Sequence, residues 1–275
     1  MIISGSGLSS KLYLKLADAT RAKQLTSIRN EAQFKREIQN FRDTAASIKT
    51  PADFVKNYDA YSVVMRAYDL ESQMFGKAMI RKILESNPSD TTSLVNRLTD
   101  SRFKDLHAAL GFTNASGPTT PTLADPAVQD KIVDKLVNQV FINRSTGENA
   151  AVGTVYKFRD KVSSITNWYS VLKDKDLVQF FQTALALPSS ISGLDISKQN
   201  DILKQKYDLT KLSDPAEREK LINRYLVLSD AANNSQSAAS NAIVQMMQPL
   251  SSDGNFVPQT LDIPAINFSA ASLYK

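Results

Sequence analysis

The sequence predicts an all-α, multi-helical protein, arranged either as two related helical units or as one merged bundle. Two observations lead to this prediction. Apolar residues recur at alternating spacings of three and four along most of the chain, which is the period of one helix face. Glycine and proline, with 9 and 10 of the 275 residues, fall mostly between these periodic segments, unlike in a turn-rich β fold. Apolar side chains make up 42% of the chain, enough for a sizeable core.

Residues 1–110 are expected to form an N-terminal helical unit. Its first helix begins near Ser9 or Ser10, either of which can act as the N-cap. Thr50-Pro51 separates two helices, because a capping threonine followed by proline is typical of a helix start. Gly111 follows the last helix directly, as expected for a left-handed residue past a helix end. The expected helices cover about residues 10–28, 34–48, 51–68, 71–85 (with Phe75 on its apolar face) and 91–110.

Residues 111–126 contain no helical pattern and are predicted to be a linker. A C-terminal helical unit is expected over residues 127–248, with a helix break at residues 145–147. Its expected helices cover about residues 126–143, 148–165, 168–186, 195–206, 215–228 and 236–248. Residues 249–275 are expected to form an extended tail, because prolines at 258 and 264 forbid a continuous helix.

The chain also resembles itself. Residues 41–70 align with residues 158–187 without a gap, so that FRDTAASIKT lies opposite FRDKVSSITN. Nine positions are identical, where chance gives roughly two. The similarity indicates an internal repeat, with one helical unit on each side of the linker. The alternative is that two amphipathic helices have converged on one pattern.

Composition excludes several kinds of chemistry. There is no cysteine, and His107 is the single histidine. Disulfides, thiolate metal sites, cysteine nucleophiles and histidine-based zinc sites are therefore excluded. The chain contains no phosphate-binding glycine loop and no G-x-S-x-G nucleophile motif. We expect no cofactor, no metal site and no catalytic residues.

The net charge is +5, but the 33 basic and 28 acidic residues are interleaved along the chain. A mixed, solvated surface explains this better than a nucleic-acid patch, so no nucleic acid is expected as a partner. No apolar run approaches the roughly 20 residues that span a bilayer, so no transmembrane segment is expected. The N-terminus lacks the charged region of a cleavable secretory signal.

The C-terminal tail is the most informative surface candidate. Its apolar residues must be buried somewhere, either along the chain's own helical body or on another subunit. The residues concerned include Leu261, Ile263, Ile266 and Phe268.

The stretch from Phe54 to Phe112 contains YDAYSVVMRAYDLES, KAMIRKILES and NRLTDSRFKDLHAALGF. It resembles an uncharacterised family of multi-helical bacterial proteins, mainly alphaproteobacterial, known only as a domain of unknown function. Members of that family are often encoded in flagellar gene clusters. The resemblance runs from about Leu8 to Asn233 and is strongest at Asn96, Arg97, Leu98, Asp100, Arg102, Phe103 and Gly111. It implies an all-helical fold and a flagellar association, and it brings no catalytic residues with it.

Three of these matched residues are charged and close in sequence. Asp100 can cap a helix that restarts after it. Arg97 and Arg102 can pair with local carboxylates or with helix C-termini. The alternative is that Arg97, Asp100 and Arg102, together with the four apolar tail residues, bind a partner.

The expected function is therefore that of a non-enzymatic structural or accessory protein that interacts with other proteins and is associated with the flagellum. Flagellar components or a second copy of the chain are the expected partners. The protein is expected in the cytoplasm, or at the flagellum after export without a cleaved signal. The alternatives are a basic regulatory nucleic-acid-binding module and an enzyme with an unrecognised carboxylate site.

Overall fold

The computed structural model of the chain describes residues 8–114, 116–119 and 121–239. The described part is almost entirely helical, as predicted, with thirteen α-helices and one pair of two-residue strands. Residues 1–231 form one compact unit and residues 232–275 a second. The predicted tail at 249–275, with Leu261, Ile263, Ile266 and Phe268, lies outside the described residues.

The first seven α-helices precede the predicted linker, and local caps explain where several of them begin. The Thr50 side chain accepts a hydrogen bond from the Asp53 N–H, while the Asp53 carboxylate accepts from the Thr50 N–H. This capping box confirms the helix start predicted at Thr50-Pro51. Gly111 has a φ of 58°, which confirms the predicted left-handed end. The elements are α1 (Ser10–Asn30), α2 (Ala32–Ala45), α3 (Pro51–Lys56), α4 (Tyr58–Ala67), the 3-10 helix η1 (Glu71–Gln73), α5 (Lys77–Leu84), α6 (Leu94–Arg97) and α7 (Arg102–Leu110).

Two helices expected in this half are broken, and both predictions of continuity are wrong. The expected helix at 71–85 is divided into η1 and α5 by a turn that contains Phe75 and Gly76. The expected helix at 91–110 is divided because the Asp100 carboxylate accepts a hydrogen bond from the Arg102 N–H at the start of α7. In both places a local turn or cap replaces hydrogen bonds of a continuous helix. The apolar spacing alone could not show where these breaks occur.

The predicted linker is held against its neighbours. It contains the antiparallel strands β1 (Thr113–Asn114) and β2 (Gly117–Pro118), and the 3-10 helix η2 (Thr122–Ala124). The Thr122 hydroxyl donates to the Ala109 carbonyl of α7, and the Gln129 amide of α8 donates to the Leu123 carbonyl. The division of the chain into domains at this segment stays a prediction.

The remaining α-helices are α8 (Pro126–Glu148), α9 (Ala150–Lys161), α10 (Trp168–Leu172), α11 (Lys175–Ala184), α12 (Ile196–Lys206) and α13 (Pro215–Ala239). The 3-10 helices η3 (Val162–Ser164), η4 (Ser189–Gly193) and η5 (Leu209–Ser213) lie between them. The helix expected at 168–186 is two helices, because the Asp174 carboxylate caps α11. The helix expected at 215–228 instead continues to Ala239.

The break predicted at residues 145–147 is also wrong, because α8 continues through Gly147 and the chain turns at Asn149. The Asn149 side chain accepts from the Val152 N–H and so caps α9. A Cβ atom on Gly153 would lie 2.0 Å from the Thr146 hydroxyl. The close packing of α8 and α9 therefore requires glycine at 153, whereas Gly147 meets nothing within 4 Å.

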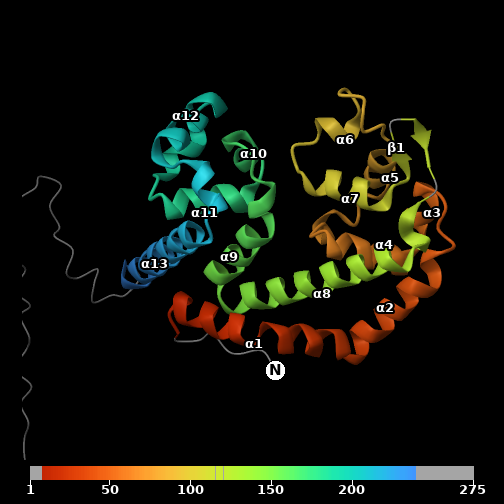
Figure 1. Cartoon of the computed structure of the whole chain (residues 1–275), viewed down its shortest axis with the longest axis horizontal. Coiled ribbons are helices and arrows are strands. Elements are labelled where there is room, and N and C mark those ends of the chain that lie inside the picture. Colours follow the sequence, from red (N-terminus) through yellow and green to blue (C-terminus); the bar gives the residue numbers. More distant parts are fainter. Residues whose placement is uncertain (1–7, 115, 120, 240–275) are drawn as a thin grey trace, which may run out of the picture. The chain divides into compact units, whose positions relative to one another are not determined.

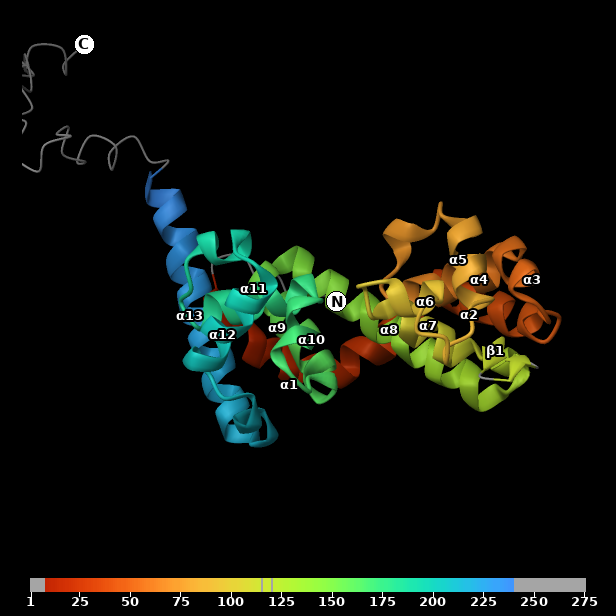
Figure 2. The same cartoon turned by 90° about the horizontal axis from the view of Figure 1, so that it is seen from above.

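Helix α8 is the central element of the unit formed by residues 1–231, and it packs against α1, α4 and α9. Figures 1 and 2 both place α3–α7 around one end of α8, and α9–α12 around the other. The largest fully buried side chains come from α2, from both groups and from α8 itself, and they include Phe41, Phe54, Tyr61, Phe141, Phe158, Phe180 and Phe181. Beside α8, the end of α4 and the start of α7 meet the end of α9 and the start of α11 around one cavity.

No helix in the described ranges combines the length and the apolar character needed to cross a bilayer.

Candidate functional site

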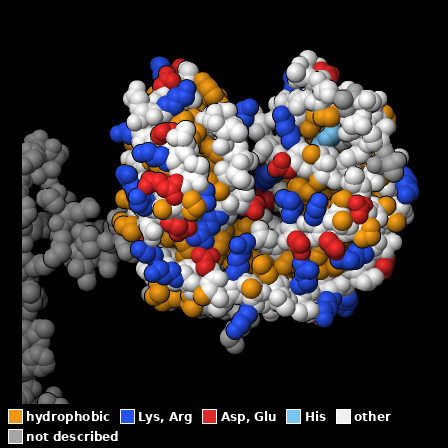
Figure 3. All heavy atoms as spheres, in the orientation of Figure 1, with side chains coloured by type: hydrophobic (Ala, Val, Ile, Leu, Met, Phe, Trp, Pro, Cys, Tyr) orange, Lys and Arg blue, Asp and Glu red, His pale blue; other side chains and the backbone are white. Residues whose placement is uncertain are grey.

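A cleft of about 280 Å³ lies where the two groups of helices meet beside α8. Figure 3 shows this hollow, with acidic and basic side chains gathered at its floor. Charged residues line it from α7, α8 and α9, from the turn after α4 and from the N-cap of α11. They are Asp69, Arg102, Asp105, Lys135, Lys157, Asp160, Lys161 and Asp174.

Arg102 organises one wall of the cleft. Its Nε and Nη2 donate to the two Asp100 carboxylate oxygens at 3.0 and 2.7 Å, and its Nη1 lies 3.1 Å from Asp69 Oδ2. Asp69 has a φ of 56°, and its backbone carbonyl also accepts from Arg102. The hydrogen bonds that Arg102 donates to Asp100 raise the pKa of Arg102. Burial opposes ionisation of Asp100, but the Arg102 hydrogen bonds outweigh it and lower the Asp100 pKa. This wall is therefore a fixed, charged network.

Lys161 organises the facing wall. Its ammonium lies 2.7 Å from Asp174 and 3.0 Å from Asp176, and Lys157 lies 3.1 Å from Asp176. Burial opposes the charge on Lys161, but Asp174 and Asp176 outweigh it and raise the Lys161 pKa. Burial likewise opposes ionisation of Asp176, and Lys161 and Lys157 lower its pKa. These charges neutralise one another.

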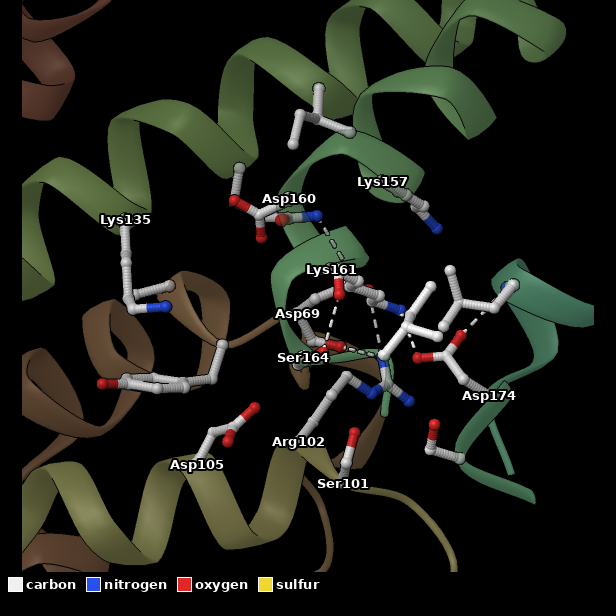
Figure 4. Close-up of a pocket in the computed structure, with 17 residues that line it drawn as sticks. Asp69, Ser101, Arg102, Asp105, Lys135, Lys157, Asp160, Lys161, Ser164 and Asp174 are labelled. Atoms are coloured by element: carbon white, nitrogen blue, oxygen red, sulfur yellow. Dashed lines mark hydrogen bonds and ion pairs between the residues drawn. The ribbon is translucent and has the colours of Figure 1, made fainter. Parts of the chain in front are cut away.

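Three charged groups between the walls make no ion pair within the described residues: Asp105, Asp160 and Lys135. Figure 4 shows Asp105 of α7 and Lys135 of α8 reaching into the same space from different sides. Lys135 Nζ lies 5.1 Å from the centre of the Tyr68 ring. Burial raises the pKa of Asp105, although Lys135 and Lys161 act against it. Burial, helped by the charge of Asp105, raises the pKa of Tyr68 to about 12. Asp105, Asp160 and Lys135 are therefore available to a ligand.

Two further cavities are connected to the cleft in series through shared lining residues. One cavity, of about 310 Å³, shares the lining residue Gln139 with the cleft. The other, of about 360 Å³, shares Arg66 and Glu71 with the 310 Å³ cavity. We call the three connected cavities the groove. It passes from the cleft across α8 and α4 to η1 and the N-terminal end of α4, where Tyr58 and Met74 line it.

Two exposed aromatic residues are associated with that end: Tyr58, which lines it, and Phe75, which follows the lining residue Met74 in the chain. The Phe75 side chain is 99% exposed, and Tyr58 is 66% exposed. The Tyr61 hydroxyl donates to the Met74 carbonyl at 2.9 Å and so fixes the turn that presents Phe75. Phe75 was predicted on the apolar face of a helix, and this prediction is wrong. The signal that could have corrected it is Gly76, which directly follows and favours a turn.

The structure brings two of the predicted partner-binding residues to the cleft. Arg102 lines it, and Asp100 holds Arg102 while capping α7, as the sequence predicted for Asp100. Arg97, the third, is exposed on α6 and does not line the cleft. Asp69, Lys135 and Lys161 were missed, because they come from segments far apart in sequence and carry no motif.

Among the residues that the structure describes, no group of three or more histidine, aspartate or glutamate side chains is placed to hold a metal ion.

Comparisons with known proteins give a fold and a family. A crystal structure of protein AGR_C_984 from Agrobacterium tumefaciens is similar over 85% of this chain and 98% of that chain, with a TM-score of 0.72 and 24% identity. No curated protein matches the chain. The model of the DUF1217 family, described as a protein of unknown function, matches residues 67–217, which is more than half of the chain and includes every charged residue that lines the cleft. The chain therefore belongs to the DUF1217 family of proteins of unknown function.

Proposed function

We propose that this protein is a non-enzymatic accessory protein that works by binding another polypeptide along the groove. The observation that carries the proposal is the 99% exposure of Phe75. Leaving a phenylalanine side chain in water forgoes about 1.5–3 kcal/mol of burial energy. Single exposed apolar residues are ordinary, but Phe75 follows Met74, which lines a cavity together with the exposed Tyr58. Aromatic anchors beside a cavity are typical of protein interfaces.

We also propose that the partners belong to the flagellar system, so that the protein acts at the flagellum or in the cytoplasm during its assembly. The support is the resemblance of residues 54–112 to a bacterial, mainly alphaproteobacterial family that is often encoded in flagellar gene clusters. A second copy of the chain is the other partner that fits this proposal.

The proposal is tested by cross-linking in cells at native expression, followed by affinity purification and mass spectrometry. We expect enrichment of flagellar rod, hook or export components with the wild type, and loss of that enrichment with Phe75→Ser. Ile196→Ser is the matched control, because Ile196 is also exposed, at 61%, but neither it nor its chain neighbours line the groove, whereas Phe75 follows the groove residue Met74. Recovery of the bait alone, or of metabolic enzymes, would contradict the flagellar proposal.

One observation favours a second candidate, the enzyme with a carboxylate site. Asp105 has a raised pKa and faces a cavity, and a carboxyl group with a raised pKa can act as a general acid. Thermal-shift screening of small metabolites would support this candidate if a compound stabilised the wild type but not Asp105→Asn. A compound that stabilised both proteins equally would count against Asp105 as its site.

A further inference from the structure

We infer that the partner polypeptide presents a basic segment, which lies along the groove from Phe75 to the cleft. This inference rests on the proposed function and adds the chemistry of the partner. It follows from which charges in the groove are already neutralised within the protein and which are not.

Nearly every cation that lines the groove is already paired. Arg66 lies 2.8 Å from Glu37, and Arg144 lies 2.6 Å from Glu31. In the cleft, Arg102, Lys157 and Lys161 are paired with aspartates as described above. These pairs are geometrically good and partly buried, so a partner could recruit their cations only by breaking them.

The carboxylates behave differently. Asp59 and Glu71 line the part of the groove near Phe75, and Asp105 and Asp160 line the cleft. None of these four carboxylates makes an ion pair or hydrogen bond within the described residues. Among the cations that line the groove, Lys135 is the single one whose side chain likewise makes neither within those residues. The groove therefore offers four uncommitted negative charges against one positive charge, although the chain as a whole has a net charge of +5.

Such a local excess of negative charge favours a partner segment that carries positive charge. A segment with lysine or arginine gains favourable interactions with these carboxylates, whereas an acidic segment would place like charges together. Tyr58, Met74 and Phe75 provide the apolar contacts at one end. The segment that fits is thus basic along most of its length, with an apolar anchor at one end.

The ends of this chain do not have that composition. Residues 240–275 contain two aspartates, Asp253 and Asp262, and one lysine, Lys275. Residues 1–9 carry no charged side chain. These two segments therefore do not fit the groove, and the occupant is a basic segment of a different polypeptide.

The first experiment measures binding of a labelled amphipathic lysine–leucine peptide to the full chain by fluorescence anisotropy, with a glutamate–leucine peptide of equal length as control. We expect the basic peptide alone to bind, and to bind more weakly as salt is added. Asp105→Asn with Asp160→Asn removes two charges and is expected to weaken binding roughly three- to tenfold. The double variant Asp59→Asn, Glu71→Gln should act similarly.

The matched control is Asp130→Asn with Asp134→Asn. It removes an equal number of negative charges from exposed positions of α8 that line no part of the groove and that pair with Arg42 and Arg29, and it should leave affinity nearly unchanged. Equal weakening by the control and groove variants would show only nonspecific attraction and would overturn the inference, as would tighter binding of the acidic peptide. Circular dichroism of every variant separates lost binding from lost folding.

The second experiment places a photo-cross-linking amino acid at Phe75 in one strain and at Asp160 in another, each in the full chain. The inference expects both positions to cross-link to one lysine- or arginine-rich segment of the same protein. Cross-links to an acidic segment would overturn it. If a partner is captured and depends on Phe75 but not on the groove carboxylates, the proposed function stands and this inference fails. If neither position captures a protein, both fail.

Discussion

The segment that begins at Thr50 and the segment that begins at Asn167 have the same succession of elements, 117 residues apart. Both residues cap a short helix, α3 or α10, through a capping box. The next helices, α4 (Tyr58–Ala67) and α11 (Lys175–Ala184), have ten residues each. These positions are opposite one another in the ungapped alignment of 41–70 with 158–187. Descent of both segments from one ancestral unit stays a prediction.

The two segments differ where they leave their helices. Asp69 and Ala186 occupy aligned positions, with left-handed φ values of 56° and 52°. The Asp69 carboxylate accepts hydrogen bonds from Arg102 and from Gln139, and so becomes part of the cleft wall. Ala186 is exposed and has no polar side chain to offer. The comparison teaches that similar backbones can carry different chemistry, and that one side chain decides which turn contributes to a site.

The largest expected effect concerns the aligned core residues Phe41 and Phe158, both almost fully buried. Phe158 stacks on Phe180 with ring centres 3.9 Å apart and meets Phe181 edge to face. Truncation to alanine should lower the free energy of unfolding by about 3–5 kcal/mol at either site. Phe158→Ala should cost about 1 kcal/mol more, because its ring pairs are lost. Urea unfolding followed by circular dichroism measures both, and a larger loss for Phe41→Ala would break the comparison.

The helix caps should behave alike in the two segments. Thr50→Ala and Asn167→Ala each remove a side chain that accepts a backbone N–H. Each should lower the free energy of unfolding by about 1 kcal/mol. Thr50→Ser and Asn167→Asp keep the acceptor and serve as controls in the same urea titrations. A loss at one cap with none at the other would mean that the segments are similar in backbone only.

The left-handed residues should respond in opposite directions to glycine. Ala186→Gly relieves left-handed strain, partly offset by the freedom of glycine in the unfolded chain, so we expect a gain of roughly 0.5 kcal/mol. Asp69→Gly relieves the same strain but removes the carboxylate that accepts from Arg102 and Gln139, and it should be destabilising. Thermal unfolding of both variants at neutral pH gives the signs. Stabilisation by Asp69→Gly would show that its cleft contacts contribute little.

The smallest expected effects appear as pH dependence. Asp176 has a lowered pKa in the folded protein, so its stabilising effect is present above the ordinary value of 3.8 and is lost as pH falls through the folded pKa. Asp105 has a raised pKa, so its ionisation at neutral pH disfavours the folded state, and this effect fades as pH falls through the raised pKa towards 3.8.

Asp176→Asn should therefore lower stability at pH 7, and Asp105→Asn should increase it. Both differences from the wild type should shrink on acidification, and the difference for Asp105→Asn should shrink first. Chemical unfolding at a series of pH values measures these differences. A destabilising effect of Asp105→Asn at pH 7 would mean that its interactions with Lys135 and Lys161 outweigh its burial.

Local signals in the sequence were reliable at several helix ends. The capping pattern at Thr50-Pro51, the glycine at 111 and the capping role of Asp100 were all predictable, because each depends on a side chain and a backbone group a few residues apart. Apolar spacing gave the helical class for the same reason. The break predicted at Gly147 was wrong, because glycine is tolerated inside a helix that tertiary packing stabilises.

The cleft could not be predicted in this way. Asp69, Arg102 and Lys161 are tens of residues apart, and charged residues of these types are common throughout the chain. The exposure of Phe75 was also missed, since an apolar residue at helical spacing normally faces inward. By itself, the sequence determined the helical fold class, most of the helix starts and the chemistry that is excluded, because these depend on composition and near neighbours. Only the tertiary structure decided which charges meet, which are neutralised and which aromatic faces water, because these depend on how distant helices pack around α8.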